Sequence, residues 1–352
     1  MRFLHTSDLH IGSPLTARLS PLKAKERKRE LIETFRQTVA EAVNAGVIGY
    51  IIAGDLFDSE KVGVRTVDST LAIMAAAKNT AFFYLPGNHE KDRLLKEKSL
   101  PNNLYVFDDE WKTYRIGNVA ITGRTTVKKD MFDSLSLPED ARNILVLHGD
   151  IGEKTDDSGV IGTYELQRLP VDYIALGHYH SYREIPLNNS LSAVYSGTPE
   201  GRGFDEVGEK GYVLLDIESS TTSHRFICRN KRTVRIVEVA LDNIETEREL
   251  EERVERGIYG IPSTDLVRVV LTGYAVPTLI RDTGALVQRF SDRFYAFEVK
   301  DEGKLFISAD KYKNDRSLKG EFIRLVMLKD ELSDDEKQKI INCGLLALMG
   351  EE

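Results

Sequence analysis

The sequence predicts an α/β protein made of a large layered domain, a small α+β unit and a helical pair. Over the first 230 residues, short apolar runs alternate with longer helical stretches, which is typical of a layered α/β domain. After His224 the pattern changes to alternating strands and charged helices, and the last 35 residues or so hold two amphipathic segments. We therefore expect domains at residues 1–230, 231–302 and 303–352.

The elements of the first domain follow from local patterns. Short apolar runs bounded by polar residues predict strands at residues 2–7, 50–53, 82–85, 119–123, 144–147, 173–176, 193–195 and 212–217. Two helices are predicted between them, at 22–43 and 67–77. The first places Leu31, Phe35, Val39 and Val43 on one face and ends at a C-cap near Gly46.

The second half predicts strands at 232–241, 266–274 and 294–299 with helices at 244–256 and 277–290. The charge run of the 244–256 helix is typical of a solvated face and secondarily of a partner surface. In the tail, Ser333 and Glu336 fit a capping box, and the apolar positions fall on one face of each helix. These positions are Phe322, Leu325, Val326, Ile340, Ile341, Gly344, Leu345 and Leu348. Two short helices bury little on each other, so they must dock on their own domain or on a partner helix.

Composition excludes several classes of protein. Hydrophobic residues make up 41% of the 352 and charged residues 30%, which argues against disorder. The chain has no apolar run long enough for a bilayer and no signal-peptide core, so we expect a cytoplasmic protein with no membrane partner. Cys228 and Cys343 are too isolated to predict a disulfide framework or a zinc site. The net charge of −8 does not indicate a basic domain that would bind nucleic acid.

Five short polar elements each follow an apolar run. They are Asp8-Leu9-His10, Gly54-Asp55-Leu56-Phe57-Asp58, Gly87-Asn88-His89-Glu90, His148-Gly149 and Gly177-His178-Tyr179-His180. Taken singly, an Asp-x-His is more often a surface turn, and a lone buried histidine is usually a core residue. In a parallel-rich sheet, however, residues just past the strands gather at one edge, where ligands bind. The sequence therefore predicts that all five elements meet.

The polar side chains of these elements predict a two-metal centre. The expected ligands are Asp8, His10, Asp55, Asn88, His148, His178 and His180. Carboxylate, amide and imidazole donors without thiolate favour Mn²⁺, Fe²⁺ or Zn²⁺, and seven ligands exceed what one ion uses. Asp55 is the natural bridge, because a carboxylate between two cations offsets their repulsion. Two ions about 3.5–4 Å apart activate a water and hold the oxygens of a phosphate ester.

His89 need not bind metal and is the expected catalytic histidine, since it can stabilise or protonate a leaving oxygen. Such a histidine needs a carboxylate partner, and Asp58 is the candidate for this second catalytic position. The alternative reading of Asp58 is an ordinary turn or helix-start carboxylate.

Together the five elements resemble the signature of calcineurin-like metallophosphoesterases. The resemblance implies a four-layer sandwich of two mixed sheets flanked by helices. It also implies that Asp8, His10, Asp55 and His180 hold one metal and that Asp55, Asn88, His148 and His178 hold the other. Mn²⁺ is the ion it suggests, with Fe²⁺, Zn²⁺ and Mg²⁺ as alternatives.

A narrower resemblance rests on other residues. Residues 5–12 (HTSDLHIG), 54–58 (GDLFD), 195–200 (YSGTPE), Phe204 and 210–216 (KGYVLLD) look like the SbcD-type DNA repair nucleases, with YhaO-like homologues nearest. This resemblance implies a DNA exonuclease or endonuclease active in double-strand break repair. It also implies an α+β capping domain, a homodimer, and a helical tail that engages the coiled coil of an SMC-like ATPase (SbcC-like).

Other readings stay open. Lys23, Lys25, Arg27, Lys28 and Arg29 are candidate DNA contacts or simply a solvated first helical turn. A phosphatase or a cyclic-nucleotide or small-molecule phosphodiesterase could use the same metals, although Ser/Thr phosphatases carry Arg-Gly where Ser59-Glu60 stands. A non-catalytic scaffold is the remaining alternative, but such relatives lose metal ligands and none is missing here.

Overall fold

A computed structural model of the protein describes residues 1–15, 19–59, 62–87, 95, 98–276, 279–305 and 315–349. The chain divides into two compact units, Met1–Val234 and Arg235–Glu352. The second unit spans both the predicted 231–302 domain and the predicted tail. No helix among the described residues is long and apolar enough to cross a membrane.

The first unit contains two six-stranded sheets. In spatial order, the first sheet consists of β14 (Thr222–Cys228), β13 (Gly211–Ile217), β1 (Arg2–Thr6), β2 (Gly49–Ala53), β3 (Ala81–Leu85) and β4 (Leu104–Val106). The second consists of β11 (Arg183–Pro186), β12 (Ser192–Tyr195), β10 (Tyr173–Gly177), β7 (Arg142–His148), β6 (Val119–Gly123) and β5 (Lys112–Ile116). In both sheets the central strands are parallel. Antiparallel pairing occurs at the β14 edge of the first sheet and at both edges of the second, so each sheet is mixed.

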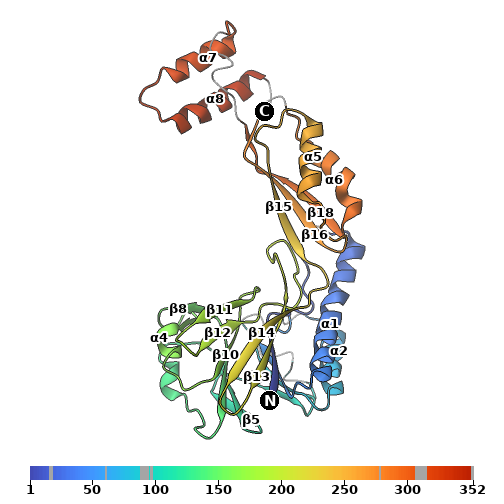
Figure 1. Ribbon diagram of the computed structural model, residues 1–352, viewed down its shortest axis with the longest axis vertical. Coiled ribbons are helices and arrows are strands. Elements are labelled where there is room, and N and C mark those ends of the chain that lie inside the picture. The colour runs from blue at the N-terminus through green and yellow to red at the C-terminus, as the bar shows by residue number, and fades with distance from the viewer. Residues whose placement is uncertain are drawn as a thin grey trace. The chain divides into compact units, whose positions relative to one another are not determined.

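The two sheets pack face to face, because Phe3 and Phe83 of the first share a buried core with Ile144 and Val146 of the second. Helices α1 (Pro21–Asn44) and α2 (Val64–Ala76) cover the outer face of the first sheet (Figure 1). The 3₁₀ segment η1 (Met131–Ser134) and the short α4 (Thr163–Leu166) pack on the outer face of the second. A two-stranded ribbon, β8 (Asp150–Gly152) with β9 (Val160–Gly162), completes the unit. The predicted four-layer sandwich is confirmed.

Helix α1 forms for local reasons that the sequence already carries. Ser20 accepts a hydrogen bond from the Lys23 backbone at 3.4 Å, Pro21 occupies the first turn, and Gly46 follows the helix with φ of +68°. The predicted apolar face is correct for Leu31, Phe35 and Val39, which are buried. It is wrong for Val43, which is 47% exposed, because Ala42 takes the last core position.

The second unit has a three-stranded sheet in the order β15 (Val234–Ala240), β16 (Leu266–Thr272) and β18 (Ala296–Asp301). Its core includes residues of α5 (Glu247–Gly257) and α6 (Thr283–Phe290). The remaining small elements are β17 (Tyr274–Ala275), η2 (Ser291–Arg293) and β19 (Lys304–Leu305). The predicted 277–290 helix is shorter than expected, and Asp282 caps its first turn through the Ala285 backbone.

The tail forms the predicted pair, α7 (Leu318–Met327) and α8 (Asp334–Met349). Ser333 and Glu336 make the predicted reciprocal cap, with the Ser333 backbone donating to the Glu336 carboxylate at 2.9 Å. Leu325 was expected in the apolar face of α7 but is 57% exposed, because Ile323 takes that position in the core between the helices.

Candidate metal centre

The predicted ligands lie where parallel strands of both sheets end. Asp8 and His10 follow β1, Asp55 follows β2, His148 ends β7, and His178 and His180 follow β10. The segments after β1 and β2 are joined by backbone hydrogen bonds, from Asp8 to the Gly54 carbonyl at 3.0 Å and from His10 to the Asp55 carbonyl at 2.9 Å. The Asp8 carboxylate accepts from the His178 backbone at 3.1 Å, which ties the two sheets together at this edge.

The backbone is strained at these positions. Asp8, His10, Asp55 and His178 all have positive φ, at +53°, +43°, +46° and +112°. Non-glycine residues rarely adopt this conformation, and it persists where the surroundings over-determine it, as at functional sites. Four expected ligands with strained backbone in one place therefore indicate a site whose geometry has a use beyond folding.

Two glycines permit the close approach of the strands. At Gly54, where φ is +98°, a Cβ would lie 1.8 Å from His148 Nδ1. At Gly177 a Cβ would lie 1.6 Å from the Ala53 carbonyl oxygen. Any larger residue at either position would push the end of β2 away from His148 and open the site.

Three histidines are oriented in the same way. Their Nδ1 atoms face an oxygen: His10 faces Asp58 at 3.3 Å, His148 the Ala53 carbonyl at 3.0 Å, and His180 Glu206 at 2.7 Å. Because a carbonyl only accepts, His148 Nδ1 must donate, which in the neutral imidazole leaves a lone pair on Nε2. Histidines that bind metal are held in this manner, with one ring nitrogen donating to an oxygen and the other facing the ion.

The donor set fits a cation. His148 Nε2 is buried, has no hydrogen-bond partner among the described residues, and lies 3.6 Å from Asp55 Oδ2. Two acceptors that face each other in a buried site cost free energy unless something positive lies between them. Asp55 Oδ2 is also 3.7 Å from His10 Nε2, and Asp8 Oδ1 is 3.9 Å from His180 Nε2. These residues would hold divalent ions.

The close ligand atoms fall into two groups: Asp8 with His10 and His180, and Asp8 with Asp55 and His148. Asp8 is common to both groups, whereas the expected bridge was Asp55. Asp55 Oδ2 does lie near both His10 and His148. The role of Asp55 as the bridge stays a prediction, and so do both assigned ligand sets.

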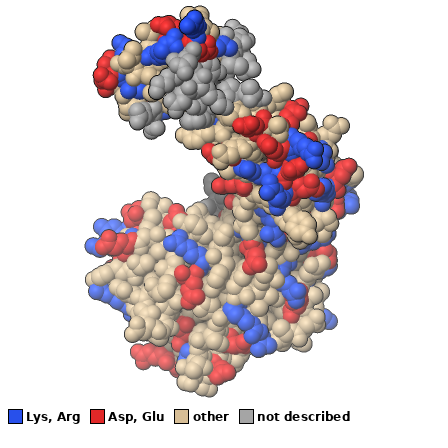
Figure 2. All heavy atoms as spheres, turned by 45° about the horizontal axis from the view of Figure 1, so that its top comes forward, with Lys and Arg blue, Asp and Glu red and all other residues tan. Residues whose placement is uncertain are grey.

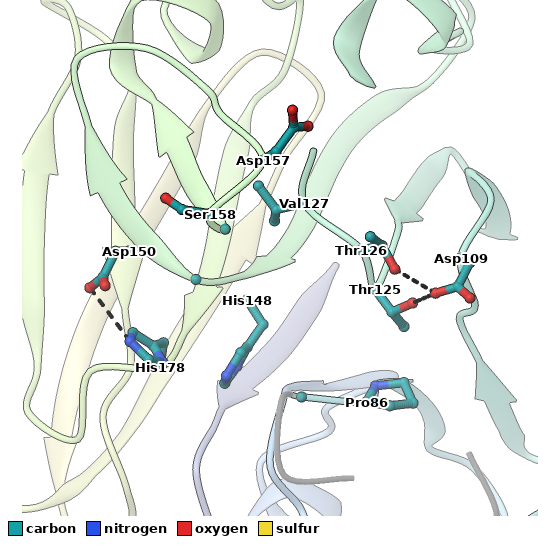
Figure 3. A pocket seen from close by; sticks show the side chains of 13 residues that line it. Pro86, Asp109, Thr125, Thr126, Val127, His148, Asp150, Asp157, Ser158 and His178 are labelled. Carbon is teal, nitrogen blue, oxygen red and sulfur yellow. Dashed lines mark hydrogen bonds and ion pairs between the residues drawn. The ribbon is translucent and has the colours of Figure 1, made fainter. Parts of the chain in front are cut away.

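His178 lies at the edge of this centre. Its ring centroid is 5.4 Å from that of His148, and its Nε2 lies 3.5 Å from the carboxylate of Asp150, a residue that the sequence analysis missed. Both histidines line a pocket of about 500 Å³, with Asp109, Asp150 and Asp157 around it (Figure 3). Asp109 accepts hydrogen bonds from Thr125 and Thr126 at 2.6 Å each.

The polar partners of the Asp58 carboxylate include His10 and Arg202. Its Oδ1 lies 3.3 Å from His10 Nδ1 and 3.1 Å from Arg202 Nη1. The hydrogen bond with His10 lowers the pKa of the Asp58 carboxyl and keeps it ionised. Asn88 and His89 lie outside the described residues, so the expected pairing of His89 with Asp58 stays a prediction.

The prediction that Arg27 contacts DNA is not supported, because this side chain is buried. Its side chain is fully buried and donates to Glu30 at 2.6 Å, to Glu200 at 2.9 Å and to the Gly201 carbonyl at 2.5 Å. A guanidinium with these partners holds α1 to the loop after β12 and cannot reach a phosphate. Lys25, Lys28 and Arg29 are exposed, and Lys23 is half-buried.

Glu206 and Arg202 were also missed by the sequence analysis. Burial would raise the pKa of Glu206, but hydrogen bonds from His180 and Arg202 outweigh it and lower the pKa to about 2. An arginine four residues before a glutamate, shortly after the last strand of the parallel set, is the signal that could have suggested them.

Comparison with known proteins identifies the family of this chain. The calcineurin-like phosphoesterase family matches residues 1–182. The DNA double-strand break repair protein Mre11 of Methanosarcina mazei is 28% identical over 231 residues, which cover 62% of this chain and 36% of that protein. Mre11 of Sulfolobus acidocaldarius is 27% identical over 266 residues, covering 70% and 68%. The uncharacterized metallophosphoesterase YhaO of Bacillus subtilis is 24% identical over 331 residues, covering 86% and 79%.

The match thus spans little more than a third of the Methanosarcina relative's length. A dimetal phosphatase structure from Danio rerio superposes with a TM-score of 0.43 at 11% identity, covering 64% of this chain and 95% of that chain. The predicted resemblance to SbcD-type and YhaO-like proteins is borne out by the named relatives. With a family match over more than half of its residues, the chain belongs to the calcineurin-like phosphoesterase family.

Proposed function

We propose that this protein is a metal-dependent phosphodiesterase that cuts DNA during the processing of broken ends. The observation that carries the proposal is the short distance between two buried acceptor atoms: His148 Nε2 lies 3.6 Å from Asp55 Oδ2. Asp8, His10 and His180 lie beside them. The names of the Mre11 relatives support DNA as the substrate.

Different residues would bind the metals, orient the imidazoles and donate the proton. Asp8, Asp55, His10, His148, His178 and His180, with Asn88, would hold two divalent ions, for which Mn²⁺ suits the donor set. When bound, such ions supply Lewis-acid charge and an activated water. Ala53, Asp58 and Glu206 keep three imidazoles in one tautomer. His89 would give a proton to the leaving oxygen.

DNA would be bound by local features rather than by a basic surface. On the face seen in Figure 2, acidic and basic side chains intermingle over the second unit. Pairs such as Arg289–Glu251 and Arg293–Glu255 account for this on α5, α6 and η2. The affinity of this chain alone should therefore be weak and salt-sensitive, with Lys25, Lys28 and Arg29 as candidate phosphate contacts.

A small-molecule phosphodiesterase is the second candidate, and the pocket beside His148 and His178 favours it. Asp109, Asp150 and Asp157 line this pocket, and the described residues around it include no Lys or Arg. Carboxylates there would accept hydroxyl or amino groups of a small substituent and would repel a second phosphate.

An end-labelled DNA assay separates these candidates. With Mn²⁺, we expect the wild-type chain to degrade single-stranded, duplex or hairpin DNA, and EDTA to stop it. His89→Asn should lower the rate by about 10²–10⁴-fold, because it removes a proton donor, while Mn²⁺ binding is retained. Hydrolysis of bis-p-nitrophenyl phosphate without any DNA cleavage would favour the second candidate, and cleavage of neither would end the nuclease proposal.

We also propose that α7 and α8 bind the coiled coil of an SMC-like ATPase. Leu318, Leu325 and Leu328 are 57–76% exposed, which leaves apolar surface available for a partner helix. Replacing Leu325 and Leu328 with Ser should abolish co-elution with such an ATPase in size-exclusion chromatography, whereas Leu22→Ser on α1, 77% exposed, should not. Co-elution that survives the double change would refute this. The same columns report whether the chain is the expected homodimer.

A further inference from the structure

Arg202 contacts two carboxylates that each face the Nδ1 atom of a predicted ligand histidine. Its Nη1 donates to Asp58 Oδ1 at 3.1 Å, and its Nε donates to Glu206 Oε1 at 2.8 Å. Asp58 in turn faces His10 Nδ1 at 3.3 Å, and Glu206 faces His180 Nδ1 at 2.7 Å. One guanidinium therefore stands behind two imidazoles that come from different sheets.

The contacts of Arg202 are suited to holding the carboxylates of Asp58 and Glu206 in a fixed orientation. Arg202 is only 14% exposed, and its backbone N–H also donates to Glu206, at 2.7 Å, so the loop closes on itself around this carboxylate. A planar guanidinium offers donors in a rigid fork, and it can hold two carboxylates at a set separation where a lysine ammonium acts as a point charge. Asp58 follows β2 and Glu206 follows β12, so the fork joins segments far apart in the sequence.

The two histidines meet at one half of the centre. Their ring centroids are 5.0 Å apart, with His10 Nε2 3.7 Å from Asp55 Oδ2 and His180 Nε2 3.9 Å from Asp8 Oδ1. The other half is held differently, because His148 Nδ1 donates to the Ala53 carbonyl. A change at Arg202 should therefore reach one half of the centre and spare the other.

We propose that Arg202 is a positioning residue of the metal centre, which fixes His10 and His180 through Asp58 and Glu206. The inference rests on the proposed function, since it takes these histidines as metal ligands. It deepens that function by naming the residue that links the outer partners of two ligands.

The test is a Mn²⁺ titration of the metal-free full chain by calorimetry. For the wild type we expect two bound ions. Arg202→Met should weaken one of the two sites by about 10–100-fold, the effect typical of losing an outer-shell partner, and leave the other unchanged. The affinity of this site in Arg202→Lys should fall between those of the wild type and of Arg202→Met. Electron paramagnetic resonance should show a coupled Mn²⁺ pair in the wild type and mainly single Mn²⁺ ions in Arg202→Met.

Arg142→Met is the matched control. Arg142 is 19% exposed and pairs with Asp172 at 2.8 Å, but it begins β7, at the end opposite His148. The Arg142→Met protein should bind two Mn²⁺ ions with wild-type affinity. Unchanged binding in Arg202→Met, or equal weakening of both sites with a lowered melting temperature, would overturn the inference. A wild type that binds no Mn²⁺ would overturn it together with the proposed function, whereas two bound ions without DNA cleavage would overturn only the nuclease proposal.

Discussion

Replacing Asp55 with Asn should abolish both metal binding and phosphodiester hydrolysis. The Asp55 side chain is 3% exposed, and its Oδ2 lies 3.6 Å from His148 Nε2 and 3.7 Å from His10 Nε2. An asparagine at this position keeps the shape of the Asp55 side chain but removes the negative charge that would offset the repulsion between two cations. Losing several kcal/mol of metal-derived stabilisation corresponds to about a 10³-fold or greater fall in rate.

The measurement is Mn²⁺ calorimetry combined with hydrolysis of bis-p-nitrophenyl phosphate. Asp172→Asn is the control, because the Asp172 carboxylate is partly buried, at 24% exposed, and pairs with Arg142 near the end of β7 that lies opposite His148. It should leave both quantities near wild type. An Asp55→Asn protein that still binds two ions with wild-type affinity would show that Asp55 is not the bridge, and Asp8, which is common to both ligand groups, would take that place.

Replacing Arg27 with Met should destabilise the first unit by about 3–5 kcal/mol, the usual effect of breaking a buried ion pair. Arg27 is fully buried between Glu30 and Glu200, which are 4% and 1% exposed. Burial alone would raise the pKa of Glu30, but hydrogen bonds from Arg232, Lys231 and Arg27 lower it to about 2. Without Arg27, the buried Glu200 carboxylate loses its guanidinium partner and keeps the backbone N–H groups of Lys231 and Arg232 as donors.

Urea unfolding followed by fluorescence measures this, because the single tryptophan, Trp111, lies in the first unit. Arg29→Met serves as the control, since Arg29 is exposed on the same helix and should change the free energy of unfolding by less than about 0.5 kcal/mol. If the two variants unfold alike, the buried ionic network does not stabilise the unit.

Several elements could be predicted from the sequence because their signals are local. The strands β2, β3, β7 and β10 contain continuous apolar runs, since both faces of a parallel sheet inside a sandwich are buried. In contrast, β14 was missed, because its burial is only partial and its residues are largely polar at the edge of the sheet. An edge strand is defined by its pairing with β13, which no local pattern reveals.

The same division holds for the candidate site. The residue types that follow the strands can be read from the sequence, and they predict a metal centre of carboxylates and imidazoles at one edge of the sheets. The oxygen that faces each imidazole, the burial of Arg27 and the contact of Arg202 with Asp58 and Glu206 depend instead on how distant segments pack. No local pattern reveals these contacts, because Arg27 and Glu200 are 173 residues apart in the chain and Arg202 and Asp58 are 144 residues apart. Whether a charged side chain faces water or a partner depends on which segments folding brings beside it.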